Sequence, residues 1–296
     1  MKSSRALVVL SVVVAVLALV AASAGLFWQG GSGPLPFTTL HGHTIELYGR
    51  GLYRYDWAFR ASILRGGDAI MLVVGVPLLA VSILLYRRGS LRGGFLLTGT
   101  LACFLYNAAS LAFGAAYNDL FLLYLVYFSA SLYAFVLAFT SIDLHALSDH
   151  VGPRMPRRGV AAFIFIAGLS PCVWLIDIVN ALAQGQVPEG LASYTTDVTT
   201  LLDVGIITPA AFLAGVLLLR RKPLGYLLTS TLLILLVLVG LLVVGQTVMQ
   251  TLDGIVLSAG EVAAYVAPFV LLSLFAIWLE ALTLRNLSDV AAEPMG

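Results

Sequence analysis

Eight long apolar runs, separated by short polar segments, fill most of this chain of 296 residues. Each run is about 20 residues or longer, enough to cross a hydrocarbon core about 30 Å thick as a helix. The runs cover residues 6–28, 67–86, 94–116, 119–142, 159–182, 199–219, 224–250 and 260–284. The pattern therefore predicts an all-α, polytopic integral membrane protein with eight transmembrane helices.

Three pairs of matching segments indicate that the chain contains an internal repeat. RRGSLRGGFLLTGTL and RRKPLGYLLTSTL agree in nine of thirteen columns once Arg92 and Gly93 are left out. The paired segments, in chain order, are 29–39 with 184–196, 87–101 with 220–232, and 144–149 with 284–289. We therefore predict two four-helix units, residues 1–150 and 151–296. Because four spans return the chain to the side of the membrane where it began, both units have the same orientation. They should be related by a two-fold axis along the membrane normal.

Composition and charge support this class and predict an orientation. Hydrophobic residues make up 60% of the chain and charged residues 10%, against about 25% charged in soluble proteins. Twelve of the sixteen basic residues lie at the termini or in every second loop, so the positive-inside rule predicts cytoplasmic N- and C-termini in a plasma (inner) membrane of prokaryotic type. The net charge of +1 gives no indication of a nucleic-acid partner; the expected partner is the lipid bilayer.

The first run has a second interpretation. Lys2 and Arg5, an apolar core and the small residues 21–25 are typical of a signal peptide with its cleavage site. The repeat favours retention instead, because this run is the counterpart of the fifth span, which cannot be a signal.

The first unit contains an insert that the second unit lacks. Thr39 and Asp68 are twenty-nine residues apart, whereas Thr196 and Asp203 are seven apart. The insert covers about residues 41–66, and its sequence pattern predicts a β-hairpin of strands 44–48 and 52–56 around a glycine turn. A short interfacial helix over 57–64 should follow it. Its arginines are Arg50, Arg54, Arg60 and Arg65, and the insert is either a lid over an external opening or a rigid cap on the helix ends.

Polar residues in or beside the spans are the candidate ligand-binding residues, because burying them is costly. They are Asp68, Asp177, Asn180, Asp203, Glu261, Tyr106, Asn107 and Tyr127. Asp68 and Asp203 occupy matching repeat positions, where they are either helix-end charges or a pair facing a shared vestibule. Arg65 or Arg60 should contact one of the carboxylates of Asp68, Asp177, Asp203 and Glu261, and Arg285 is a possible partner for Glu280.

Two further patterns bear on function. Tyr124, Tyr127 and Ser131 recur at helical spacing, which is typical of packing between helices or of a binding wall. An H-x-H pair at His41 and His43, close to Glu46, is too small a set for a metal site, and no metal or cofactor is predicted.

The leading hypothesis is a protein that binds or transports a small or amphipathic ligand between its two halves, with transport as the most concrete form. A membrane-embedded sensor or scaffold with a protein partner is one alternative. An intramembrane lipid-modifying enzyme is the other, and the absence of a catalytic motif makes a non-enzymatic role the favoured one.

Overall fold

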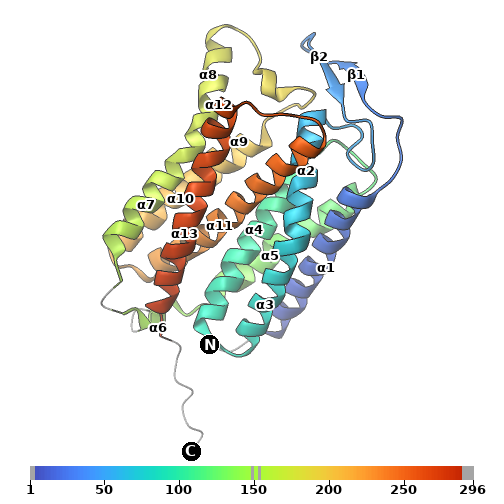
Figure 1. Ribbon diagram of the computed structural model, residues 1–296. Coiled ribbons are helices and arrows are strands. Elements are labelled where there is room, and N and C mark those ends of the chain that lie inside the picture. Colours follow the sequence, from blue (N-terminus) through green and yellow to red (C-terminus); the bar gives the residue numbers. More distant parts are fainter. Residues whose placement is uncertain (1–3, 148–149, 153–154, 289–296) are drawn as a thin grey trace, which may run out of the picture.

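The computed structural model describes residues 4–147, 150–152 and 155–288 and is built almost entirely of helices (Figure 1). Eight helical segments are long and apolar enough to cross a membrane, as the sequence predicted. They are α1 (Arg5–Phe27), α2 to α3 (Ala58–Arg87), α4 (Leu91–Gly114), α5 (Phe121–Thr140), α7 to α8 (Arg157–Ala183), α9 to α10 (Val198–Leu219), α11 (Pro223–Leu252) and α12 to α13 (Ala259–Arg285). The chain is thus a multi-pass membrane protein.

Helix α11 lies at the centre of the bundle. It packs against α10 and α13, and against α2 and α4 of the first half. Small residues allow these helices to approach closely: a Cβ added at Gly66 on α2 would collide with the backbone of Gln246, and one at Gly99 on α4 would collide with Ile234. Close approach of this kind is what holds helices together in a bilayer, where burial of apolar surface gives little driving force.

Three spans contain a widened π turn, each followed by a proline. The turns are Met71–Gly75, Asp203–Ile207 and Val262–Val266, and the helices α3 (Val76–Arg87), α10 (Thr208–Leu219) and α13 (Ala267–Arg285) begin immediately after them with proline at the second position. Proline lacks an N–H and its ring clashes with the carbonyl four residues earlier, so the turn before it cannot remain α-helical. These turns are places where a helix can bend.

A hairpin lies at one end of the bundle, which we call the hairpin end; the start of α1 and the end of α13 lie at the opposite end, which we call the terminal end (Figure 1). Strand β1 (Leu35–Thr38) pairs antiparallel with β2 (Thr44–Leu47). The predicted pairing of 44–48 with 52–56 is therefore wrong. Residues preceding the insert supply the first strand, and residues 49–56 form turns that return the chain to the helices.

The predicted interfacial helix is also wrong as a separate element. Residues 58–70 form α2 (Ala58–Ile70), which continues through the π turn into α3. This extension packs along α11, because Gly66 gives it the space to do so. The second span is consequently thirty residues long, and Asp68 lies ten residues inside it.

The two halves differ in how their outer helices pack. In the first half α1 packs directly on α5. In the second half α7 (Arg157–Leu169) and α13 share an aromatic contact, Phe163 with Phe275, whose ring centroids are 6.4 Å apart. The helices α7 and α13 therefore pack less closely than α1 and α5.

Candidate functional site

Arg65 joins the insert end of α2 to the second half. Its Nη1 donates to both carboxylate oxygens of Asp253, at 2.6 and 2.7 Å, and to the Tyr48 hydroxyl at 2.6 Å. Ser62 donates to the same carboxylate at 2.7 Å. Asp253 follows the last residue of α11, so the pair fixes α2 to α11 at the hairpin end.

The other insert arginines have different surroundings. Arg54 forms an ion pair of 3.0 Å with Asp119, and Arg60 donates to the Thr199 hydroxyl at 3.0 Å. Arg50 is exposed. The insert does fold back onto the helix ends, but the predicted partners were wrong: Arg65 pairs with Asp253, and Arg60 pairs with none of the four expected carboxylates. Asp253 and Asp119 lie in short loops between helices, outside the spans from which the candidate carboxylates were taken.

Asp68 is buried inside the bundle and is neither a helix-end charge nor part of a vestibule. The Tyr53 hydroxyl donates to its carboxylate at 2.7 Å. The carboxylate lies against Gly25 of α1, where any side chain would collide with it. Burial and the neighbouring Asp68 charge raise the pKa of Tyr53 well above its usual range, so this hydroxyl keeps its proton and remains a donor. Asp68 thus fixes the insert to α1 and α2.

Asp56 is a buried carboxylate that the sequence analysis missed. One of its oxygens accepts hydrogen bonds from the Ala116 amide at 2.8 Å and from the Tyr194 hydroxyl at 2.7 Å. Its other oxygen is buried with no hydrogen-bond partner among the described residues. Burial raises the pKa of Asp56 to about 6, against the lowering effect of these bonds and of the Arg60 charge. The only sequence signal was an acidic residue within a tyrosine-rich insert.

Asp203 contacts a small cavity between the first half and the second. Tyr106 of α4 donates to its carboxylate at 2.8 Å. The cavity has a volume of about 50 Å³, and apart from Tyr106 its walls come from the second half. They are formed by Tyr106, Ile164, Ala167, Gly168, Ser170, Pro171, Asp203, Ile207, Ala211, Leu232, Leu235, Leu236, Val239 and Phe269. Two predicted site residues therefore meet in one place.

The remaining candidates do not join this cavity. Tyr127 is buried and donates to Asn107 at 3.2 Å, and Tyr124 and Ser131 are buried on the same helix face, so this stripe packs between helices. Asp177 and Asn180 are exposed on α8 (Leu175–Ala183). Glu261 is exposed and forms a capping box with Ser258 at the start of its helix, which is a structural role.

Glu280 of α13 is a second carboxylate whose setting the sequence did not predict. It is buried, and the Ser230 hydroxyl of α11 donates to it at 2.6 Å. Arg285, the expected partner, forms no ion pair with it. The bond joins α11 to α13 near the terminal end.

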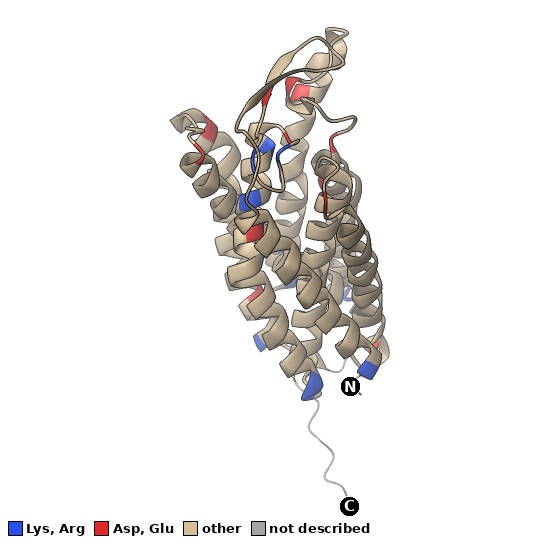
Figure 2. Ribbon diagram, turned by 90° about the vertical axis from the view of Figure 1, so that its right-hand side faces the viewer, with Lys and Arg blue, Asp and Glu red and all other residues tan. Residues whose placement is uncertain are grey.

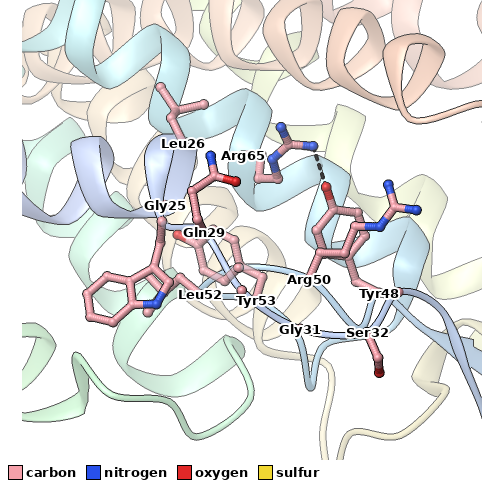
Figure 3. Close-up of a pocket in the computed structure, with 14 residues that line it drawn as sticks. Gly25, Leu26, Gln29, Gly31, Ser32, Tyr48, Arg50, Leu52, Tyr53 and Arg65 are labelled. Atoms are coloured by element: carbon pink, nitrogen blue, oxygen red, sulfur yellow. Dashed lines mark hydrogen bonds between the residues drawn. The ribbon is translucent and has the colours of Figure 1, made fainter.

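A larger cavity, which we call the hairpin-end cavity, lies where α1 ends and the insert begins (Figure 3). Its volume is about 350 Å³. It is lined by residues 25–26, 28–33, 48, 50–53 and 65. The side chains of Tyr48, Arg50 and Arg65 meet on one side of it, and the Arg65–Tyr48 hydrogen bond is visible there (Figure 3).

Comparison with known proteins gives no further identification: no protein-family model, no curated protein and no solved structure matches the chain. Within the described ranges, no group of three or more His, Cys, Asp or Glu side chains is placed to hold a metal ion.

Proposed function

We propose that the protein binds a small or amphipathic ligand inside the membrane, at the cavity where α4 faces the second half, and that its two halves arose by duplication. The observation that carries the proposal is the Tyr106–Asp203 pair beside an otherwise apolar cavity. A ligand with an apolar body and a hydrogen-bond donor, such as an alkylammonium group, fits both parts. Transport is the most concrete form of this function.

Access to the cavity requires movement, and the helices around it are built in a way that favours movement. A volume of about 50 Å³ holds only a few water molecules. Asp203 itself begins one π turn, and another lies just before Phe269 on the opposite wall. π turns of this kind are frequent at functional sites and permit bending.

The opening we propose lies between α7 and α13 and faces the lipid. Trp174 is stacked on Tyr265 and Phe269, with ring centroids 5.6 and 5.9 Å apart. Side chains, rather than closely packed backbones, fill this gap, whereas α1 packs directly on α5; we propose that rotation of the rings opens it. An amphipathic molecule already dissolved in the bilayer would enter by this route.

A photoreactive long-chain alkylammonium probe tests the proposal. The purified protein in lipid nanodiscs is illuminated with the probe, and labelled positions are found by mass spectrometry. Labels should concentrate on the cavity walls and fall in Asp203→Asn, but persist in Asp177→Asn, which removes an exposed carboxylate of the same half. Uniform labelling of lipid-facing residues, or equal labelling in the two variants, would refute the proposal.

A membrane-embedded scaffold is the second candidate, favoured by the exposed hairpin. Strand β1 is exposed along its whole length, and Leu40 in the turn that follows is 95% exposed. An exposed strand edge with apolar side chains can pair with a strand of another protein. Replacing Leu35, Phe37 and Leu40 by Ser should abolish capture of a partner and leave probe labelling of the cavity unchanged.

Charge distribution supports a definite orientation for either candidate. Figure 2 shows Lys and Arg gathered at the terminal end, with a second group of basic residues in the insert. We infer that the terminal end faces the cytoplasm of a plasma (inner) membrane, because twelve of the sixteen basic residues lie at the termini or in every second loop and only four lie in the insert.

A further inference from the structure

The hairpin-end cavity is separate from the cavity at Asp203 and is not used by the proposed function. Its lining comes entirely from residues 25–65. Its volume of about 350 Å³ lies within the range of small-molecule sites.

Two glycine-rich segments form a preorganised wall for this cavity. Gly33 donates to the Gly49 carbonyl at 3.1 Å, and Gly51 donates to the Gly30 carbonyl at 2.9 Å. A Cβ at Gly31 or Gly49 would collide with the backbone of the facing segment, and both glycines have positive φ values of 92° and 67°. Other residues would force the segments apart, so the wall exists before any ligand binds, which lowers the entropic cost of binding.

The side chains on the opposite side are hydrogen-bond donors with positive charge. All of Arg65's hydrogen bonds to other described residues use Nη1, which leaves Nε and Nη2 as further donors. Asp253 compensates the Arg65 charge. Arg50 lines the same cavity and forms no ion pair in the described part of the chain, so it supplies the net positive charge.

Tyr48 lies between these two charges. The Arg65 guanidinium carbon is 5.5 Å from the centre of its ring. Its hydroxyl accepts from Arg65 and can donate its own proton to Asp253, 3.4 Å away. Arg65 is therefore held in place by Tyr48 and Asp253, and its free donors have a fixed position.

The mouth of the cavity lies where the apolar surface of α1 ends. Phe27, the last residue of α1, is 66% exposed, and Trp28, which lines the cavity, is 43% exposed. Aromatic residues at the end of a span are typical of the headgroup level of a bilayer. Trp28 and Arg50 line the same cavity, so we infer that the cavity is accessible from the headgroup level.

We propose that the hairpin-end cavity binds an oxyanion, a phosphate or carboxylate group, through Arg50 and the free donors of Arg65. Guanidinium groups bind such anions with short, charge-assisted hydrogen bonds. The oxyanion is carried by a lipid headgroup or by a soluble molecule, and these two sources share the same recognition chemistry.

Calorimetric titration of the full-length protein in a neutral maltoside detergent tests the site. The probes are dioctanoyl phosphatidic acid, dioctanoylglycerol, which lacks the phosphate, and inorganic phosphate. Arg50→Gln should weaken binding of the phosphorylated probes about tenfold or more. Arg54→Gln, an insert arginine outside the cavity, should leave it unchanged. Ser32→Glu places a negative charge on the exposed cavity rim and should also weaken binding of the phosphorylated probes.

The outcomes separate the two sources and can overturn the site. Binding of phosphatidic acid alone, dependent on Arg50, assigns a lipid headgroup; binding of inorganic phosphate as well, with the same dependence, shows that a soluble oxyanion suffices. Equal binding of dioctanoylglycerol, or equal affinities in Arg50→Gln and Arg54→Gln with unchanged melting temperatures, would overturn the proposal. Neither result depends on Asp203, so failure here leaves the proposed function untouched.

Discussion

Arg65 and Asp253 are 188 positions apart in the chain, yet the arginine donates to both oxygens of the aspartate at 2.6 and 2.7 Å. The two side chains are only 20% and 16% exposed. The pair joins the insert end of α2 to the loop after α11, and so the first half to the second.

Removing either member of this pair should destabilise the protein. Arg65→Met leaves an unpaired, largely buried carboxylate and Asp253→Asn an unpaired guanidinium, so each should cost about 2 kcal/mol or more. The double variant should cost less than the sum of the two, with a coupling of about 1–3 kcal/mol. Unfolding in mixed micelles by sodium dodecyl sulfate, followed by circular dichroism, measures each value.

The ion pair of Arg54 and Asp119 provides the matched control. Its side chains are 30% and 49% exposed, so the corresponding variants Arg54→Met and Asp119→Asn should cost about 0–1 kcal/mol. A cost equal to that of the Arg65 variants would show that burial does not decide the strength of these pairs.

Gly66 should be intolerant of alanine, whereas its neighbour Gly67 should accept it. A Cβ at Gly66 would collide with the backbone of Gln246 on α11, while one at Gly67 would meet nothing nearer than Leu242 Cδ2 at 4.0 Å. Gly66→Ala should therefore cost about 1–3 kcal/mol. Gly67→Ala should be neutral or stabilising by up to about 1 kcal/mol, because alanine favours a helix.

The same unfolding titration compares the two glycine variants. Similar stabilities would mean that α2 and α11 do not approach closely at Gly66, and the close crossing between the halves would be wrong.

Stability should fall as the pH rises from about 4 to about 6, in part because of Asp56. Burial raises the pKa of this carboxyl from 3.8 to about 6, so the folded state binds a proton that the unfolded state has already lost. Protonated Asp56 therefore adds about 3 kcal/mol to the free energy of unfolding for a pKa shift of this size. This contribution is fully present below pH 4 and is lost as the pH rises past 6. Asp56→Asn should be the more stable protein at pH 7 and should lose this part of the pH dependence. Parallel pH profiles for the two proteins would contradict the assignment to Asp56.

Reporter fusions test the orientation. A reporter inserted at Gly89, in the loop between α3 and α4, should be cytoplasmic, and one inserted at Gln186, after α8, should be on the opposite side. The inverse pattern would mean that the four insert arginines, and not the twelve other basic residues, determine how the chain inserts into the membrane.

Hydropathy predicted the helices well because a bilayer leaves the chain few choices. Every backbone N–H and C=O in the hydrocarbon must be paired, so a long apolar run has to be a helix. All eight spans were found in this way, with ends mostly within three residues of those observed. The second span is the exception: it begins at Ala58 because Gly66 lets a polar extension pack on α11.

Sequence alone could not assign partners to the charged residues. Insert arginines do form ion pairs with carboxylates, as predicted, but the carboxylates are those of Asp253 and Asp119. The expected partners were Asp68, Asp177, Asp203 and Glu261. Likewise, strand β2 pairs with residues 35–38 and not with the predicted residues 52–56. Several partners of the same chemical type were available in each case, and only the distances set by the packed helices distinguish them.

The sequence by itself thus determined the class of the protein and the number of its spans, because both follow from the need to pair every backbone polar group inside a bilayer. Tertiary structure decided where the cavities lie, that Tyr106 meets Asp203, that Asp56 and Asp68 are buried, and that Arg50 is left without an ion pair among the described residues. Those features depend on differences of a few ångströms in the distance between helices that are far apart in the chain. Two apolar runs with the same hydropathy can pack closely or at a larger distance, so hydropathy does not predict that distance.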